Sequence, residues 1–328
     1  MMKEKLEFMK RIDCDDVGPL KEYVGCKVDR DYTHRSIKLT QPVLLQSYND
    51  EYKIDDVRVC VTPADPGSML VKADPSGIVK KARHTYYRSG VGKLLHMTRW
   101  SRPETQNSVR DLSRHGSGPN EAHIKAMHKC MKYCVETPNR GWFLQPSRQW
   151  DGIDKTFLFR VNGISDSDYA KCPTTRRSVS GYGTFLENAP ITVKSAMQKI
   201  ITLSVTEAEV VAAVQCTQDM LQIKRILNAM ELQVELPMVL EVDNSGAVDL
   251  INGWSAGGRT RHMDTRFSFT RELKEAGIIN VIWIAGVNNA SDLYTKNLPG
   301  PVFNKHTKVF CGDDEYGKPK AKRESDGE

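Results

Sequence analysis

The order of strands and helices predicted after residue 156 constrains the fold of this chain more than any other feature. Three short segments rich in β-branched and aromatic residues follow one another, and a long segment with apolar residues at steps of three and four comes next. The predicted strands cover residues 157–165, 178–187, 191–196, 238–243 and 281–286, and the long helix covers 204–230. Further helices complete the series. Strands mixed with helices in this order predict an α/β sheet with helical cover.

The first half of the chain is predicted to form a smaller unit. At 328 residues the chain is long enough for two domains. Short apolar runs alternate with polar turns over residues 20–62, which indicates strands, and the pattern predicts a loop at 63–85. Helical patterns cover 86–97, 104–115 and 120–136, and a linker follows at 146–155. We therefore expect one domain at 1–145, a second at 156–300, and a charged, disordered tail at 312–328.

The composition excludes few partners. Hydrophobic residues make up 39% of the chain and charged residues 27%, as in ordinary globular proteins. The net charge of +6 permits a polyanionic partner without requiring one. The eight cysteines are scattered, the N-terminal segment lacks the apolar core of a signal peptide, and no run approaches about 20 apolar residues. These features predict a reduced, intracellular protein of the cytoplasm or nucleus, without a membrane partner.

Three aspartates fall at positions where a sheet can gather them. Asp166 follows the first predicted strand of the second unit, and Asp243 ends the fourth. Asp292 opens the predicted final helix and reaches the same rim if that helix packs back on the sheet. Each aspartate also fits a structural role alone: Asp243 as a helix cap, and Asp292 as a first-turn acid that favours the helix dipole.

A fourth acid is selected by helical phase. Glu207 and Glu209 both lie in the first turns of the long helix. The core-facing stripe is formed by Ala213, Cys216, Met220, Ile223, Leu227 and Met230. Glu209 lies one step of four before this stripe and faces the sheet, whereas Glu207 points away at about 100° per residue. Ser204 and Glu207 instead fit the S-x-x-E capping box.

Four carboxylates gathered at one rim repel one another unless cations neutralise them. Two Mg²⁺ ions about 3.5 to 4 Å apart perform this role in two-metal phosphodiester hydrolysis. Mg²⁺ prefers hard oxygen ligands, and the sequence offers no Cys/His cluster for zinc. We therefore expect two Mg²⁺ ions, for which Mn²⁺ can substitute.

These residues lie within a set of strings that resembles a known family. The strings are YRSGVGKLLHMTRWSRPE (87–104), SDSDYAKCPTTRRSVSGY (165–182), LSVTEAEVVAA (203–213), EVDNSGAVDL (241–250), RTRHMDTRFSFTREL (259–273) and ASDLYTKNLPGP (290–301). They resemble the polyprotein of copia-type retrotransposons, from the end of the reverse transcriptase through the RNase H domain. The resemblance covers most of residues 20–310.

The resemblance implies a fold and an activity. It implies an RNase H-like mixed five-stranded sheet with helices, preceded by a smaller α+β remnant of the reverse transcriptase with a primer-grip hairpin and thumb or connection helices. It also implies that Asp166, Glu209, Asp243 and Asp292 are the catalytic residues and metal ligands. The implied reaction is cleavage of the RNA strand of an RNA/DNA hybrid, which the 2′-hydroxyls distinguish from DNA.

The polymerase centre of this family is missing from the sequence. Reverse transcriptases need a Y-x-D-D hairpin, and Asp15 and Asp16 have no tyrosine two residues before the pair. Gly18 and Pro19 also break the strand that should follow. We therefore expect no polymerase activity from this chain alone.

Five basic residues lie near the predicted acidic rim in sequence order: Arg176, Arg177, Arg259, Arg261 and His262. They are expected to contact backbone phosphates, or else to form an ordinary solvated surface. The leading hypothesis is thus a retrotransposon-derived ribonuclease H that acts on RNA/DNA hybrids. The alternative is a catalytically silent nucleic-acid-binding fragment of a decayed element. The sequence predicts no oligomeric state.

Overall fold

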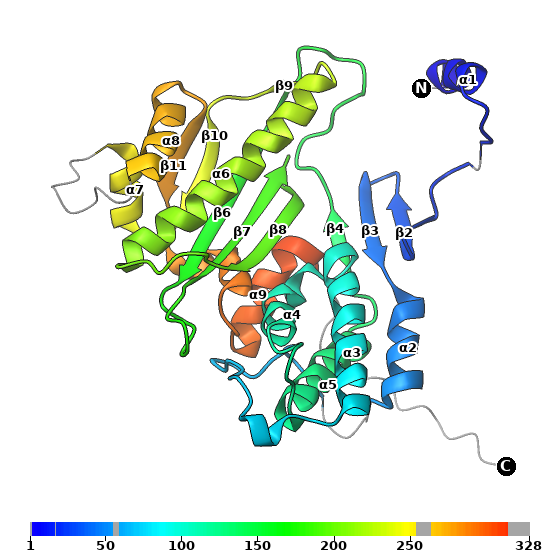
Figure 1. Cartoon of the computed structure of the whole chain (residues 1–328). Coiled ribbons are helices and arrows are strands. Elements are labelled where there is room, and N and C mark those ends of the chain that lie inside the picture. Colours follow the sequence, from blue (N-terminus) through cyan, green and yellow to red (C-terminus); the bar gives the residue numbers. More distant parts are fainter. Residues whose placement is uncertain (1, 17, 55–58, 254–263, 314–328) are drawn as a thin grey trace.

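The computed structural model describes residues 2–16, 18–54, 59–253 and 264–313 (Figure 1). In the first half the elements are α1 (Met2–Arg11), β1 (Glu22–Tyr23), β2 (Cys26–Asp31), β3 (Ser36–Thr40), α2 (Pro42–Tyr52), η1 (Pro75–Gly77), α3 (Lys81–Trp100), η2 (Pro103–Thr105), α4 (Gln106–Ser113), α5 (Glu121–Glu136) and β4 (Trp142–Leu144). In the second half they are β5 (Leu158–Phe159), β6 (Val161–Asp168), β7 (Val179–Leu186), β8 (Ala189–Met197), α6 (Val205–Ala229), β9 (Gln233–Val234), β10 (Met238–Val242), α7 (Ser245–Asn252), α8 (Asp264–Glu275), β11 (Ile279–Trp283), η4 (Gly286–Asn288), η5 (Ala290–Tyr294) and α9 (Gly300–Cys311).

The second half is built on a mixed sheet of five strands in the order β11-β10-β6-β7-β8. β6, β7 and β8 run antiparallel, whereas β10 is parallel to β6 and β11 is parallel to β10. The predicted mixed five-stranded α/β sheet with helices is confirmed. Its parallel part places the ends of β6 and β10 at the same rim, as the sequence required.

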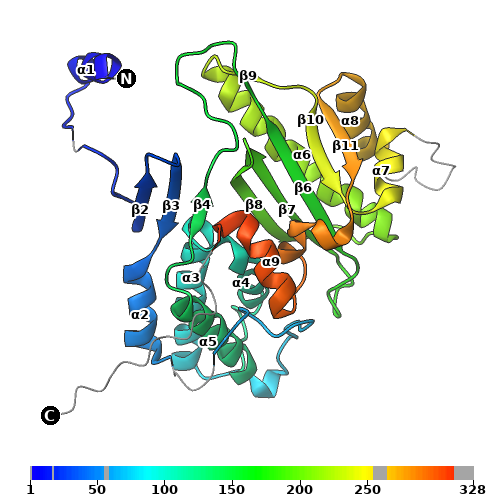
Figure 2. The same cartoon turned by 180° about the vertical axis from the view of Figure 1, so that it is seen from behind.

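Both faces of this sheet are covered. The helix α6 crosses one face (Figure 1), while η5 and α9 pack on the other (Figure 2). Gly163 on β6 lets α6 approach, since a Cβ there would lie 2.6 Å from the Cys216 sulfur. Side chains alternate between the faces along each strand. Tyr182 therefore joins the core under α6, and Phe185 joins the core under α9.

The first half contains a four-stranded sheet in the order β1-β2-β3-β4 and a group of helices. The strands are antiparallel, and β4 returns after the helices to pair with β3. Part of the strand prediction for residues 20–62 is wrong, because residues 42–52 form α2. Pro42 stands at the start of that helix, where a proline loses no hydrogen bond and has a suitable φ angle.

The two halves share one hydrophobic core. The helix α9 begins at the last residue of the second predicted domain and continues beyond it. Its Phe303 packs on Tyr133 of α5 with ring centroids 5.6 Å apart. Its Phe310 stacks on Phe185 of β7 at 5.7 Å. The division at 145 and 156 stays a prediction, and most of the predicted tail, residues 314–328, lies outside the described residues. Within the described ranges, no helix has both the length and the apolar content needed to cross a membrane.

Candidate metal centre

Three aspartates meet where β6, β10 and η5 come together. One carboxylate oxygen from each of Asp166, Asp243 and Asp292 lies within 4.8 Å of the others. Asp166 is buried, with 2% of its surface exposed, and the other two are half-buried. The strand register explains the first pair: Val242 of β10 lies opposite Ser165 of β6, so the next residues of the two parallel strands, Asp243 and Asp166, are neighbours.

Asp292 reaches the cluster because η5 lies directly against β7. Gly181 of β7 is paired with Asp166, and a Cβ at Gly181 would lie 2.6 Å from Cγ2 of Thr295 and 2.8 Å from Cβ of Tyr294. The prediction that Asp292 opens the final helix is wrong. It lies within the short 3-10 helix η5, and α9 begins only at Gly300.

Asn289 holds η5 in place at its N-terminal end. Its side-chain oxygen accepts a hydrogen bond from the Ser291 backbone N–H at 3.1 Å. Its Nδ2 donates to the Ser165 carbonyl at 2.9 Å, one residue before Asp166. One buried amide thus caps η5 and ties it to β6.

Glu209 approaches the cluster from α6. Its Oε1 accepts hydrogen bonds from the Ser167 backbone N–H at 3.2 Å and from the Ser167 hydroxyl at 2.9 Å. Its Oε2 is buried and has no hydrogen-bond partner among the described residues. Burial, followed by the negative charges of Asp166 and Asp243, raises the pKa of Glu209 to about 9.

Glu207 has the capping role that the S-x-x-E pattern predicted. Its backbone N–H donates to the Ser204 hydroxyl at 3.1 Å, and its carboxylate accepts from the Leu203 backbone N–H at 2.6 Å. The carboxylate thus reaches one residue farther back than in a standard capping box. Glu207 is nevertheless buried, because the loop before α6 folds over it.

Two residues that the sequence analysis missed contact the cluster directly. The Thr295 hydroxyl donates a hydrogen bond to Asp166 Oδ2. The Lys296 Nζ lies 2.6 Å from Asp292 Oδ1 and 3.3 Å from Asp166 Oδ1. The spacing of Asp292 and Lys296, four residues apart, was the only sequence signal for this contact.

The cluster holds more negative than positive charge, and burial together with this excess raises the pKa values of Asp292 and Asp243. Burial and the nearby Asp166 raise the pKa of Asp292 to about 7, although Lys296 opposes the shift. The pKa of Asp243 is raised by the same two causes and is also opposed by Lys296. Burial alone would lower the pKa of Lys296, but Asp166 and Asp292 raise it overall.

The donor set fits divalent cations. Every candidate ligand is a carboxylate oxygen, which is the ligand type that Mg²⁺ prefers. The unpartnered Oε2 of Glu209 offers a further acceptor at the edge of the three aspartates. The residues present are therefore suited to hold Mg²⁺ at this rim.

The predicted phosphate-binding residues are only partly described. Arg176 and Arg177 are exposed in the turn between β6 and β7, beyond the end of the strand that carries Asp166. Arg259, Arg261 and His262 lie outside the described residues. The structure thus brings three of the four predicted acids within 4.8 Å of one another, while Glu209 lies beside them on Ser167.

Comparisons with known proteins give relatives for most of the chain. No family model matches. The chain is 27% identical over 300 residues to a retrovirus-related Pol polyprotein from transposon TNT 1-94 of Nicotiana tabacum. The aligned region covers 90% of this chain and 22% of that protein. It is 28% identical over 219 residues to the corresponding polyprotein from transposon RE1 of Arabidopsis thaliana, covering 67% of this chain and 14% of that protein. The chain thus spans less than a quarter of the length of these relatives.

Among solved structures, LC11-RNase H1 in complex with an RNA/DNA hybrid aligns with 42% of this chain and 94% of its own, at 14% identity and a TM-score of 0.34. A second structure of LC11-RNase H1, isolated from compost by a metagenomic approach, aligns with the same 42% of this chain and 92% of its own, at 15% identity and a TM-score of 0.33.

Proposed function

This chain is a homologue of the retrovirus-related Pol polyproteins of transposons, and we propose that its second half is a ribonuclease H that cleaves the RNA strand of RNA/DNA hybrids. The observation that carries the proposal is the grouping of Asp166, Asp243 and Asp292 at one rim of a mixed five-stranded sheet. Glu209 adds a fourth buried carboxylate beside them. The strings that resemble copia-type elements favour that branch of the relatives.

The cluster suits phosphodiester hydrolysis with Mg²⁺, or with Mn²⁺ as a substitute. Bound divalent cations at such carboxylates supply an activated water and stabilise the leaving oxygen. Asp166 interacts electrostatically with both other aspartates and is oriented by the Thr295 hydroxyl. Asn289 and Gly181 set the position of Asp292 against the sheet.

Lys296 gives the metal-free cluster a counter-ion of its own. Its ammonium group contacts both Asp166 and Asp292. Divalent cations therefore compete with Lys296 for these two carboxylates. Its side chain is long and about a third exposed, so it can turn toward solvent without a change in the backbone.

The test is a cleavage assay on the purified chain. A hybrid labelled on the RNA strand is incubated with the protein and Mg²⁺ or Mn²⁺, and circular dichroism establishes that the protein is folded. We expect cleavage of the RNA strand, its loss in Asp243→Asn, and its loss in Glu209→Gln. Glu207→Gln is the matched control and should retain cleavage.

A folded protein that leaves the hybrid intact with both metals would overturn the proposal. If such a protein still binds the hybrid in a salt-dependent way, the chain is a nucleic-acid-binding fragment without turnover.

A further inference from the structure

A groove of about 810 Å³ lies between helices α3 and α4 of the first half and the edge strand β8. Four of its lining residues carry basic side chains: His96, Arg99, Arg110 and Lys194. Asp219 is its one acidic lining residue, and one of its carboxylate oxygens accepts hydrogen bonds from the hydroxyls of Tyr182 and Thr192. The groove is therefore positively charged.

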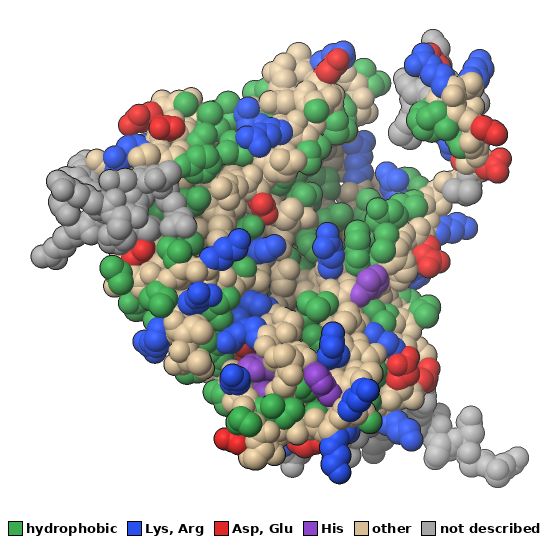
Figure 3. Space-filling model, viewed as in Figure 1, with side chains coloured by type: hydrophobic (Ala, Val, Ile, Leu, Met, Phe, Trp, Pro, Cys, Tyr) green, Lys and Arg blue, Asp and Glu red, His purple; other side chains and the backbone are tan. Residues whose placement is uncertain are grey.

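Among the described residues, the exposed basic groups of this groove have no ion-pair partner, and its buried arginine lies near the charges of Asp111 and Asp168 without a hydrogen bond to either. Arg99 and Lys194 are exposed, and among the described residues neither has a carboxylate within ion-pair distance. Arg110 is largely buried and donates only to neutral groups, the Ser195 hydroxyl at 3.0 Å and the Asn107 side-chain oxygen at 2.8 Å. On the face shown in Figure 3, Lys and Arg side chains gather over the lower end of the sheet and the adjoining helices. Most of the acidic side chains in this view lie toward the outline of the molecule.

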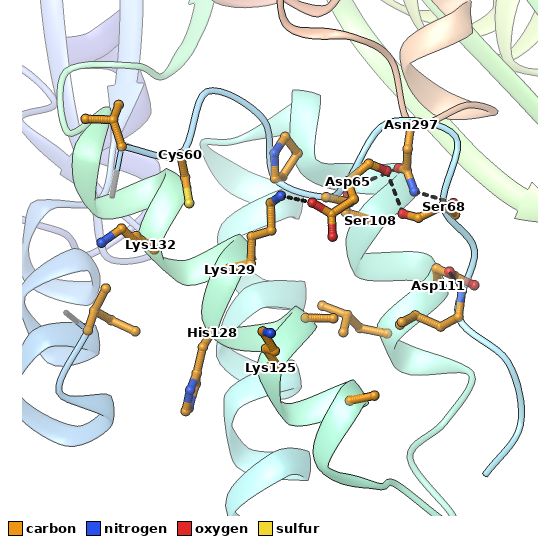
Figure 4. Close-up of a pocket in the computed structure, with 18 of the residues that line it drawn as sticks. Cys60, Asp65, Ser68, Ser108, Asp111, Lys125, His128, Lys129, Lys132 and Asn297 are labelled. Atoms are coloured by element: carbon orange, nitrogen blue, oxygen red, sulfur yellow. Dashed lines mark hydrogen bonds and ion pairs between the residues drawn. The ribbon is translucent and has the colours of Figure 1, made fainter. Parts of the chain in front are cut away.

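A second cavity shows the contrasting case. It has about 760 Å³ and lies between α5 and the loop that contains Cys60 and Asp65 (Figure 4). Two of its lysines are already paired, Lys129 with Asp65 and Lys132 with Glu136. Asp65 of the loop and Glu136 therefore neutralise two of the lysines of this cavity. The cavity is for that reason a weaker candidate for an anionic ligand than the groove.

The strand register places the groove close to the acidic cluster. Asp166 of β6 lies opposite Gly181 of β7, which lies opposite Ser195 of β8. Ser195, the residue that Arg110 contacts, is thus two strand spacings, about 10 Å, from Asp166 on the same face of the sheet. One turn of a nucleic-acid duplex is about 34 Å long, so a single duplex spans both places.

The helix α4 connects the groove to the turn between β6 and β7. Arg110 lies near enough to Asp168, the last residue of β6, for their charges to interact. One turn later, Arg114 donates from Nη2 to the Cys172 sulfur at 3.0 Å. The exposed Arg176 and Arg177 of that turn continue the basic surface from the groove toward the rim.

We propose that this groove binds the phosphate backbone of the RNA/DNA hybrid whose RNA strand is cut at the acidic cluster. The inference rests on the function proposed above and extends it. The first half of the chain then contributes to substrate binding through α3 and α4, in addition to its packing against the sheet. Lys and Arg contacts to phosphates give affinity without base specificity.

The test compares hybrids of two lengths. Binding is measured by fluorescence anisotropy in an Asp243→Asn background, so that no cleavage interferes. One labelled hybrid has about 20 base pairs, and the other has about 6, or about 20 Å, which reaches from the acids only to the near end of the groove and offers fewer phosphates along it. The variant Arg99→Gln/Lys194→Gln removes the two exposed charges without disturbing a buried side chain. Lys308→Gln, an exposed lysine of α9 that does not line the groove, is the control.

We expect the groove variant to weaken binding of the long hybrid more than binding of the short hybrid, because the long hybrid places more phosphates along the groove. The slope of log affinity against log salt should fall by about 2 for the long hybrid, close to 0.9 for each lost phosphate contact. The control should change neither quantity. Unchanged affinity and slope for the long hybrid would assign the groove to another kind of partner and overturn the inference.

The two proposals can fail separately. A wild-type protein that cuts hybrids, combined with a groove variant that binds the long hybrid normally, removes only the inference. A wild-type protein that cuts nothing, but whose groove variant loses affinity for the long hybrid, removes only the catalytic proposal. Absence of hybrid binding by the wild-type protein at low salt removes both.

Discussion

Two of the buried ionic groups among the described residues differ in whether the chain itself balances their charge. In the first half, Arg102 and Glu104 are each 1% exposed and are joined by a hydrogen bond of 2.7 Å. The Arg102 Nη1 donates to the carbonyls of Cys134 and Thr137, and the Tyr133 hydroxyl donates to Glu104. This group is satisfied from within, as a structural ion pair must be.

The acidic cluster of the second half is not balanced in this way. Its carboxylates gather around a single described cation, Lys296, and Glu209 retains an oxygen without a partner. Such an arrangement costs stability in the absence of a ligand. The comparison teaches that burial of charge alone does not identify a site. The identifying feature is charge that the fold gathers and leaves uncompensated.

The largest expected effect tests the balanced group. Arg102→Met leaves Glu104 as a buried charge without its partner, and we expect a loss of about 3–5 kcal/mol in the free energy of unfolding. Urea unfolding followed by circular dichroism measures it. The double variant Arg102→Met/Glu104→Leu should recover much of the loss. A loss below about 1 kcal/mol in the single variant would show that the pair is not a structural requirement.

The next effect concerns the unbalanced group and its cations. Mg²⁺ at about 100 times its dissociation constant should stabilise the wild-type protein by about 2.7 kcal/mol, because it binds the folded state. Asp243→Asn should lose most of this gain. Unfolding midpoints in Mg²⁺ are compared with those in NaCl at equal ionic strength. Equal stabilisation of both proteins would place the bound Mg²⁺ elsewhere.

A smaller effect is expected from pH in the metal-free protein. The pKa of Asp292 is raised from its ordinary value of 3.8 to about 7. The folded protein therefore holds a proton that the unfolded chain has lost between these pH values, so stability falls as pH rises through that window. We expect a fall of about 1–2 kcal/mol, less than the full shift implies, because buried charges relax and take up water.

Asp292→Asn is the variant that tests this pH dependence. It should be more stable than the wild-type protein at pH 8 without metal and similar to it at pH 4. Unfolding in urea at both pH values, with EDTA present, gives the comparison. A variant that is less stable than the wild-type protein at pH 8 would contradict the account of uncompensated charge.

The smallest expected effect concerns the Ser204 cap of α6, which lies outside the acidic cluster. Ser204→Ala removes the side-chain cap of α6 and should cost about 1 kcal/mol while leaving hybrid cleavage intact. Thermal unfolding and the cleavage assay measure the two quantities on one preparation. Loss of cleavage without loss of stability would mean that the cap also positions Glu209.

The sequence was informative where local geometry determines the outcome. Asp243 follows β10 and Asp166 lies near the end of the neighbouring parallel strand β6, so the two share a rim, although Asp166 was predicted to follow its strand. Helical phase separates Glu209 from Glu207. The α/β class followed from the order of the segments, whereas the mixed five-stranded sheet was implied by the family resemblance. The class and the choice of Glu209 need only the periodicities of strands and helices.

The sequence was less informative where tertiary contacts decide. The apolar run at residues 42–52 suits a strand or a buried helix equally well, and packing against α5 selects the helix. Lys296 reaches Asp166 only because η5 lies on β7, which depends on the missing side chain at Gly181. No local pattern encodes that contact.

The position of α9 has a consequence for how the molecule comes apart. This last helix inserts Phe303 beside Tyr133 and Phe310 beside Phe185, so it is shared between the two halves. Its removal would open the core on the side of the sheet where η5 holds Asp292. We therefore expect the helices of the first half and the five-stranded sheet to unfold in a single cooperative transition, so that unfolding of either half unfolds the other.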